Sequence, residues 1–149
     1  MNATATPAIH PLIARLFDSH GYARLEPATL EGFLREPGEA VLFLSEDPVR
    51  YRETLDLAVI LPELRRASAK PFRVGVLLPE HSREVARTYA VRFWPALVYL
   101  RAGEFLGTIE GLRDWSDFHA LSQALLSGPA KPLPPKVIPV ASGAPSSCA

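Results

Sequence analysis

The apolar positions of the chain predict helices and strands in alternation. Residues 40–44 form a continuous apolar run with the length of a strand that is buried on both faces of a sheet, and residues 72–78 predict a second apolar strand. Further on, strands at 96–100 and 105–110 flank a short Gly-containing connection, which is typical of a β-hairpin. A short strand is also predicted at 22–25. Helical spacing predicts helices over residues 10–20, 29–35, 51–69, 80–89 and 114–126.

The order of these elements predicts an α/β fold. Strands that alternate with helices favour parallel pairing, and the final hairpin adds antiparallel strands. We therefore expect a mixed sheet of about four to five strands flanked by helices. Leu55, Val59 and Leu64 are expected in the core. Pro62 is expected to kink its helix because it has no backbone N–H to donate. Five residues of the last helix are expected to face inward: Trp115, Phe118, Leu121, Leu125 and Leu126.

The composition indicates one domain followed by a tail. A chain of 149 residues is long enough for one domain with a substantial core. From residue 129 onward, proline is mixed with alanine, serine and glycine, and no periodic apolar face remains. We therefore predict a domain over residues 1–128 and a disordered, Pro-rich tail over residues 129–149.

The charge balance and the hydropathy argue against two classes of partner. Lysine plus arginine equals aspartate plus glutamate, 16 each, so the chain lacks the basic excess that nucleic-acid binding requires. No apolar run approaches the roughly 20 residues that span a bilayer. The first ten residues show no basic region followed by an apolar core, as an export signal would. We expect a cytoplasmic protein without stable membrane insertion, and a homodimer is left open.

One segment resembles thioredoxin. Residues 89–104, with the sequence YAVRFWPALVYLRAGE, resemble the thioredoxin stretch in which a helix ends, a cis-proline opens a strand and a Gly-containing turn follows. Gly111 stands where that family has a glycine before its last helix, and Pro62 resembles the proline of its kinked helix. With the element order, the resemblance covers about two thirds of the chain and implies a thioredoxin-like fold.

The chain departs from thioredoxin where thioredoxin does its chemistry. Counting back from Pro62, the CxxC motif would fall on residues 54–57, which read Thr-Leu-Asp-Leu. The only cysteine of the sequence is Cys148. Dithiol exchange needs an attacking thiolate and a second sulfur that resolves the mixed disulfide. We therefore predict a function through binding, with a redox protein that uses Cys148 as the enzymatic alternative.

Three segments are similar to the hydrogenase expression/formation family of HyaE or HupG type. They are residues 46–64, 92–97 and 111–115, which read EDPVRYRETLDLAVILPEL, RFWPAL and GLRDW. The resemblance implies a non-catalytic accessory chaperone in [NiFe] hydrogenase maturation. It further implies that the partner is the hydrogenase small-subunit precursor with its twin-arginine signal peptide. The alternative is a general thioredoxin-like interaction module with an unrelated client, gripped through the Pro-rich tail.

The first part of the candidate partner site lies where the central strand ends. Glu46 and Asp47 follow the strand at 40–44, at the end where ligand sites of open α/β sheets gather. Two adjacent carboxylates suit a pair of guanidinium groups through charge-assisted hydrogen bonds. Pro48 continues the same loop, and Asp56, at the lost thiol position, is a candidate for the same role.

The alternative for this loop is a solvated turn in which Glu46 or Asp47 helps the next helix to start. Arg50 and Arg52 lie nearby in the sequence and are candidates to neutralise the two acids. Exposed ion pairs of that kind contribute only about 0–1 kcal/mol.

Trp94 and Pro95 form the second part of the candidate site. Pro95 opens a strand, and an exposed strand edge can accept an extended peptide by β-augmentation. A partly exposed tryptophan is a good anchor for a partner. The alternative is that Pro95 serves only the fold and that Trp94 fills the core. Leu112, Trp115 and Phe118 are expected in the core rather than on a docking face.

No cofactor or metal is predicted. The four histidines, His10, His20, His81 and His119, lack the spacing of metal ligands. No serine lies in a strand–turn–helix nucleophile motif, so hydrolase chemistry has no positive signal either.

Overall fold

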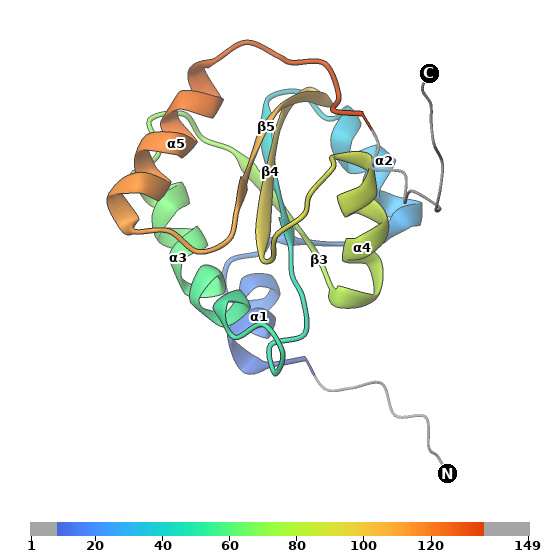
Figure 1. Cartoon of the computed structure of the whole chain (residues 1–149), viewed down its shortest axis with the longest axis vertical. Helices are drawn as coiled ribbons and strands as arrows, with labels where there is room; N and C mark the ends of the chain where they lie inside the picture. The colour runs from blue at the N-terminus through green and yellow to red at the C-terminus, as the bar shows by residue number, and fades with distance from the viewer. Residues whose placement is uncertain (1–8, 136–149) are drawn as a thin grey trace, which may run out of the picture.

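The computed structural model describes residues 9–135 and folds them into five helices and one five-stranded sheet (Figure 1). The elements in chain order are α1 (Pro11–Asp18), β1 (Ala23–Leu25), α2 (Pro27–Arg35), β2 (Glu39–Leu44), α3 (Glu53–Ala67), β3 (Arg73–Leu77), α4 (Pro79–Thr88), β4 (Ala96–Arg101), β5 (Glu104–Glu110) and α5 (Trp115–Ser127). Each predicted strand and helix is therefore present, with bounds that differ by a few residues.

The sheet is mixed, as predicted, with the strand order β1-β3-β2-β4-β5. Strands β1, β3 and β2 run parallel, whereas β4 pairs antiparallel with both β2 and β5. The central strand β2 is buried on both faces from Ala40 to Leu44, which explains its uninterrupted apolar sequence.

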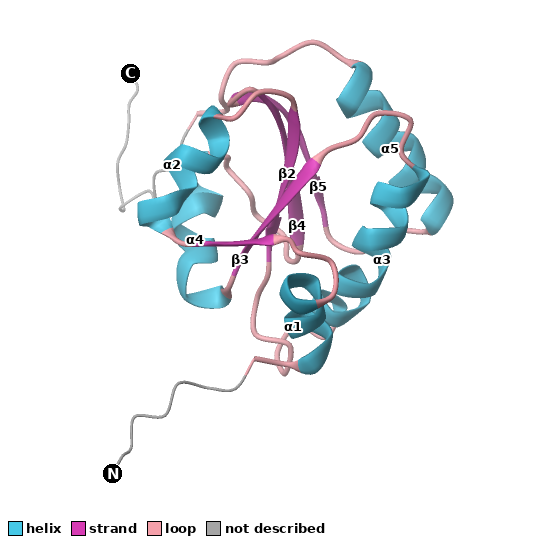
Figure 2. Cartoon of the chain, turned by 180° about the vertical axis from the view of Figure 1, so that it is seen from behind, coloured by secondary structure: helices cyan, strands magenta, loops and turns pink. Residues whose placement is uncertain are grey.

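Helices cover both faces of the sheet (Figure 2). Helices α1, α3 and α5 lie on one face over a core that includes Phe43, Leu57 and Phe118. Helices α2 and α4 lie on the other face over a second core that includes Leu42, Phe33 and Val85. Two apolar layers thus enclose the sheet, as the alternation of helices and strands predicts.

Prolines begin three of the helices. Pro11, Pro27 and Pro79 each occupy the first helical turn, where the missing N–H would have no helical partner in any case. His10 precedes α1, and its Nδ1 accepts the Leu12 N–H at 3.1 Å. Pro62 lies inside α3, as predicted, and cannot donate to the carbonyl four residues earlier.

The prediction that Val59 lies in the core is wrong. Its side chain is 53% exposed, whereas the inward stripe of α3 follows Leu57, Leu61 and Leu64. Val59 is two residues from Leu57, and at about 100° per residue this places it on the opposite side of the helix. The prediction for Leu64 is confirmed, since its side chain is buried. Leu55 is partly buried and packs against the core.

Two expected core residues of α5 are also exposed. The buried stripe of that helix follows Phe118, Ser122 and Leu126, at intervals of four residues. Trp115 and Leu121 lie off this stripe and are exposed, so their predicted burial is wrong. The polar Ser122 takes an inward position because its hydroxyl accepts the Tyr99 O–H at 2.8 Å.

The beginning of the predicted tail touches the domain. Residues 129–135 form neither helix nor strand, but the Lys131 N–H donates to the Phe105 carbonyl of β5 at 2.7 Å. The remainder of the tail, including Cys148, lies outside the described residues. The division at residue 128 and the disorder of the tail stay predictions.

Glu39, the first residue of β2, is an ion-paired carboxylate. We expect its protonation to lower the stability of the fold. Glu39 accepts Arg101 Nε at 2.9 Å and lies 3.6 Å from Lys70 Nζ. The hydrogen bond from Arg101 lowers the pKa of the Glu39 carboxyl, against an opposing effect of burial. A lowered pKa in the folded state stabilises the protein above the ordinary glutamate pKa, and this contribution disappears as the pH falls.

We expect Glu39→Gln to lower the free energy of unfolding at pH 7 by about 1 kcal/mol. The difference from the wild type should shrink as the pH falls below about 4. Urea unfolding at pH 7 and pH 3 measures both values. Glu31→Gln is the control, because Glu31 pairs with Arg35 on the surface of α2 and should change stability by less than about 0.5 kcal/mol.

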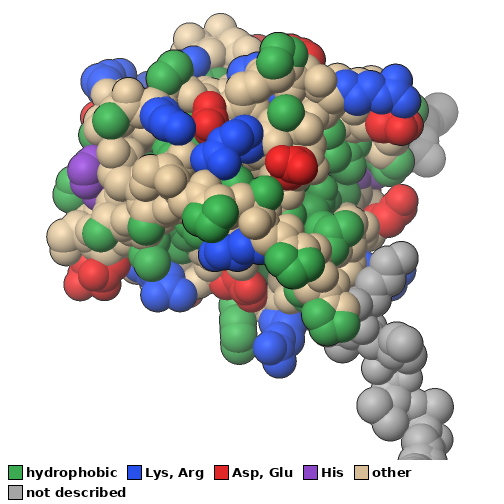
Figure 3. Space-filling model, turned by 90° about the horizontal axis from the view of Figure 1, so that it is seen from above, with side chains coloured by type: hydrophobic (Ala, Val, Ile, Leu, Met, Phe, Trp, Pro, Cys, Tyr) green, Lys and Arg blue, Asp and Glu red, His purple; other side chains and the backbone are tan. Residues whose placement is uncertain are grey.

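No helix among residues 9–135 is both long enough and apolar enough to cross a bilayer. On the face drawn in Figure 3, acidic and basic side chains of the described residues are interspersed, which agrees with the equal numbers of the two charges in the sequence.

Candidate functional site

The predicted site residues come from loops that meet at one edge of the sheet. In the strand register, Leu44 of β2 lies beside both Leu77 of β3 and Ala96 of β4, and Ala96 lies beside Glu110 of β5. The loops after β2, β3 and β5 and the loop before β4 are therefore neighbours. We call this region the carboxyl edge, and it lies at the lower end of the sheet in Figure 1.

Glu46 is buried, although it carries a charge. It is only 3% exposed, and its two carboxylate oxygens already have partners. Oε2 accepts Arg83 Nε of α4 at 3.0 Å, and Oε1 accepts the Asp47 N–H at 2.9 Å. The Glu46 N–H donates to Thr54 Oγ1 at 3.3 Å. A charge-neutralising arginine is thus present, but it is Arg83 rather than the neighbouring arginines of the loop.

Asp47 shapes the loop that follows β2. Its Oδ1 accepts the Val49 N–H at 3.0 Å, and its carbonyl accepts the N–H groups of Arg50 and Tyr51 at 3.1 and 2.8 Å. These bonds form a turn that contains Pro48 and leads toward α3. Asp47 is half-buried and makes no ion pair with any residue between 9 and 135. Its carboxylate therefore keeps capacity for an external cation.

Three of the predicted residues line a common cleft of about 470 Å³. Glu46, Asp47 and Pro48 form part of its wall, and Glu80 at the start of α4 adds a third carboxylate. The wall also contains one cation, Arg24. The remaining lining is mainly apolar, from Ile9, Ile13, Val49, Leu78 and Pro79, with His10 and Ser45. We call this the acidic cleft, and its size falls within the range of ligand sites.

Asp56 does not belong to the acidic cleft. It lies in the first turn of α3 with its side chain exposed, and it is absent from the cleft wall. Thr54, two residues earlier, is fully buried and joins this turn to Glu46 through the bond described above. The structure thus places Asp56 at the same end of the sheet but does not bring it together with Glu46 and Asp47.

Trp94 and Pro95 lie at the carboxyl edge on the other side of β2. The peptide bond between them is cis, and the Pro95 carbonyl accepts the Gly111 N–H at 2.8 Å. Pro95 is buried, and Trp94 is partly buried against the core beneath α2 and α4. Neither residue lines the acidic cleft. Trp94 is thus neither fully buried nor fully exposed, and its role as a partner anchor stays a prediction.

Three apolar side chains on the segments next to the carboxyl edge are exposed, which the sequence did not predict. Phe93 is 66% exposed and Trp115 is 46% exposed, and Leu112 is also exposed. Glu110, the last residue of β5, holds the loop before β4, because its Oε1 accepts the Phe93 N–H at 3.0 Å. We call Phe93, Trp94, Leu112 and Trp115 the apolar rim.

The expectation that Leu112 and Trp115 lie in the core is wrong, because Phe118 and Leu126 already fill the inner face of α5. A signal was present in the sequence. Polar residues Arg113, Asp114, Ser116 and Asp117 interrupt the apolar ones here. Single exposed apolar residues are ordinary on a protein surface, whereas large contiguous apolar patches are typical of interaction sites.

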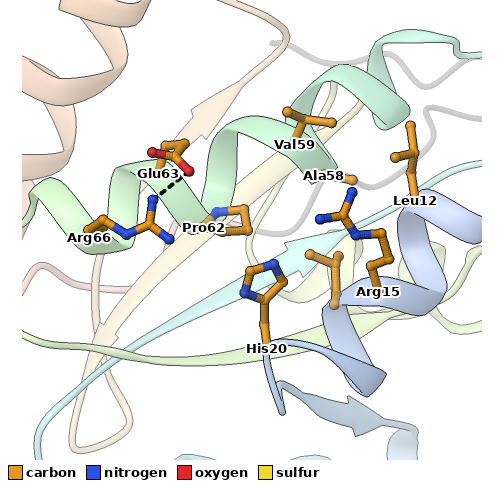
Figure 4. A pocket seen from close by; sticks show the side chains of 9 residues that line it. Leu12, Arg15, His20, Ala58, Val59, Pro62, Glu63 and Arg66 are labelled. Carbon is orange, nitrogen blue, oxygen red and sulfur yellow. Dashed lines mark hydrogen bonds and ion pairs between the residues drawn. The ribbon is translucent and has the colours of Figure 1, made fainter.

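A second hollow, of about 180 Å³, lies between α1 and α3 and does not involve the predicted site (Figure 4). Pro62 and Ala58 line it from α3, and Arg15 and His20 extend toward it from α1 and the following turn. Arg66 is paired with Glu63 at 2.7 Å. The hollow is smaller than the about 300–1,000 Å³ of small-molecule sites.

Solved structures define the class of this protein. A thioredoxin mutant from Halobacterium salinarum NRC-1 superposes with a TM-score of 0.55 at 18% identity, covering 70% of this chain and 90% of the other. A fragment of ERdj5 gives a TM-score of 0.58 at 17% identity, covering 76% and 55%. The protein therefore has a thioredoxin fold, as predicted. Residues 9–135 include no thiol, since the only cysteine of the sequence, Cys148, lies outside them.

The family is also shown. Residues 12–118 match the family described as hydrogenase-1 expression protein HyaE, and the chain belongs to this family. It is 37% identical to the hydrogenase expression/formation protein HoxO of Cupriavidus necator, over 93% of this chain and 88% of the relative. It is 41% identical to HupG of Rhodobacter capsulatus, over 85% and 94%. These findings confirm the HyaE/HupG resemblance of the sequence.

A solved relative has the same fold. The crystal structure described as a putative HupG from Rhodopseudomonas palustris CGA009 superposes with a TM-score of 0.50 at 31% identity. The match covers 70% of this chain and 95% of that chain. Family membership and thioredoxin fold therefore apply to the same part of the molecule.

Proposed function

We propose that this protein is a non-catalytic accessory chaperone in hydrogenase maturation, which binds the precursor of the small subunit through its twin-arginine signal peptide. The names of its relatives, hydrogenase expression/formation proteins, support the pathway. In this proposal the protein works in the cytoplasm, where a precursor still carries its export signal. It acts by holding the chain, since thiol exchange would require two sulfurs at the carboxyl edge.

The observation that carries the proposal is the acidic cleft. A twin-arginine signal joins two guanidinium groups to an apolar segment, and the cleft joins three carboxylates and one arginine, Arg24, to a mainly apolar lining. Asp47 and Glu80 make no ion pair among residues 9–135, so both can accept a cation from the peptide. Charge-assisted hydrogen bonds to guanidinium groups are about twice as strong as neutral ones.

The apolar rim is the second half of the proposed site. The acidic cleft lies over the ends of β2 and β3, and the apolar rim lies over the start of β4 and the end of β5. The loop with Pro48 and the highly exposed Val49 follows β2, which stands between β3 and β4 in the sheet. An extended peptide that crosses this loop would place its arginines in the cleft and its apolar part on the rim.

Titration of a synthetic twin-arginine signal peptide against the protein tests this proposal. We expect the double variant Asp47→Asn/Glu80→Gln to bind about tenfold more weakly, because two exposed charge pairs of up to about 1 kcal/mol each are lost. Glu84→Gln is the matched control on α4, since Glu84 is exposed and does not line the cleft. Isothermal calorimetry at low and moderate salt gives the affinities.

Two outcomes would contradict the proposal: no binding by the wild type, or equal binding of a peptide in which lysines replace both arginines. A chain that ends at Gly128 should bind the peptide as the full chain does. Loss of binding in that truncated chain would favour the alternative function, a module that grips its client through the Pro-rich tail.

A further inference from the structure

The ion pair between Glu46 and Arg83 is strongly asymmetric. The Glu46 side chain lines the acidic cleft and is 3% exposed, whereas the Arg83 side chain lies outside the cleft lining and is 63% exposed. The contact between them is the single bond from Nε to Oε2 at 3.0 Å. The acid is therefore fixed within the protein, and the base that neutralises it is largely in water.

We propose that the Glu46 carboxylate is a binding site for one guanidinium group, that Arg83 occupies this site in the free protein, and that an arginine of a bound chain enters by displacing Arg83. The inference deepens the proposed function, because it rests on that function for the identity of the bound chain. The guanidinium site itself rests on the geometry of Glu46 alone.

The surroundings of Glu46 are those of a prearranged acceptor. The Asp47 N–H donates to Oε1, and the Glu46 N–H donates to Thr54 at the start of α3. The carboxylate is therefore held in one orientation, with Oε2 toward α4. The first turn of α4 is fixed as well, since the Ser82 hydroxyl donates to the Leu77 carbonyl at 2.8 Å.

Exchanging the Arg83 guanidinium for another guanidinium on Glu46 costs less free energy than removing Arg83 alone. A buried carboxylate left without a cation costs stability, so replacing Arg83 with another guanidinium is favoured over releasing Arg83 with no replacement. Arg83 can leave because most of its side chain is already hydrated, and an incoming arginine keeps the charge balance. Lysine is a poorer replacement, because an ammonium lacks the planar fork of donors that matches a carboxylate.

The site also assigns different tasks to the acids of the cleft. Glu46 would take one arginine of the pair, at the depth now reached by Arg83. The half-buried Asp47 and the exposed Glu80 would take the second arginine nearer to solvent. The exchange therefore predicts that a chain with two adjacent arginines binds more tightly than a chain with one.

Chemical rescue tests the guanidinium site without any partner. We expect Arg83→Ala to melt below the wild type, and N-ethylguanidinium to raise its Tm by about 3–6 °C at ten times the dissociation constant. N-ethylammonium at the same ionic strength should raise it much less. Arg87→Ala is the matched control, since Arg87 is exposed on the same helix and makes no ion pair among residues 9–135.

The double variant Glu46→Gln/Arg83→Ala should show no rescue, because the acceptor is gone. No rise in Tm for Arg83→Ala, or an equal rise with both cations, would overturn the guanidinium site. If Arg83→Ala does not fold, Arg83→Lys in the same assay decides, with a smaller rise expected because the lysine competes for the site.

Peptide titration tests the displacement. We expect Arg83→Ala to bind the twin-arginine peptide about tenfold more tightly than the wild type, because the internal competitor is absent. Equal or weaker binding by Arg83→Ala would overturn the displacement while leaving the proposed function intact. If neither protein binds the peptide, the proposed function fails, and the rescue experiment still decides whether Glu46 is a guanidinium site.

Discussion

Replacing Leu64 with alanine is expected to lower the free energy of unfolding by about 2–5 kcal/mol. Leu64 is 1% exposed and belongs to the core between the sheet and helices α1, α3 and α5. Truncation removes buried methyl and methylene groups and leaves a cavity that neighbouring side chains fill only in part. Urea unfolding followed by circular dichroism gives the value, provided that the slope of the transition is unchanged.

Val59→Ala is the matched control for this prediction. The hydrophobic pattern alone assigns Leu64 and Val59 to the same core, but the structure places Val59 on the solvent side of α3. We therefore expect Val59→Ala to change stability by no more than about 0.5 kcal/mol. A loss of about 1 kcal/mol or more would mean that Val59 is covered, for example by a second copy of the chain, and an increase of that loss with protein concentration would show it.

The strands were predictable because their burial is recorded locally in the sequence. The run at 40–44 is apolar without interruption, and the structure buries every residue of it between two layers of helices. The cis bond before Pro95 agrees with the thioredoxin resemblance, and Pro62 lies inside α3 as the helical pattern predicts.

The helix faces were less predictable, because an apolar residue on a helix can pack in the core or lie exposed on the surface. Trp115 has the size and hydropathy of a core residue, and its pattern position is close to that of Phe118. Only the packing of α5 against β5 decides that Phe118 turns inward and that Trp115 stays at the carboxyl edge. An exposed anchor and a core residue therefore have the same sequence signal.

The candidate site illustrates a second limit. Glu46 and Asp47 are adjacent acids, and the sequence suggests equal roles for both. The structure separates them, because Arg83 lies 37 residues away in the chain and reaches only Glu46. A long-range ion pair leaves no periodic trace in a single sequence. For the same reason the sequence does not predict that Glu80 lines the cleft. This follows only from the register of β2 and β3, which places the segment after β3 beside the loop after β2.

The largest effect on binding is expected at the apolar rim. Phe93→Ala and Trp115→Ala should each weaken binding of the signal peptide by about 10- to 30-fold, since large aromatic side chains dominate the energy of interfaces. Both residues are exposed in the free protein, so the Tm of each variant should remain close to that of the wild type. Fluorescence anisotropy of a labelled peptide measures the affinity, and thermal unfolding supplies the stability.

The same variants distinguish the two halves of the proposed site. A second peptide keeps both arginines but carries serine and glycine in place of its apolar segment. Trp115→Ala should not affect the affinity for this peptide, because the contact that it removes is already absent. Leu121→Ala is the control for surface apolarity, since Leu121 is exposed further along α5. An equal loss of affinity for both peptides would mean that Trp115 affects binding indirectly, by supporting the structure of the carboxyl edge. The apolar rim would then not be a peptide contact.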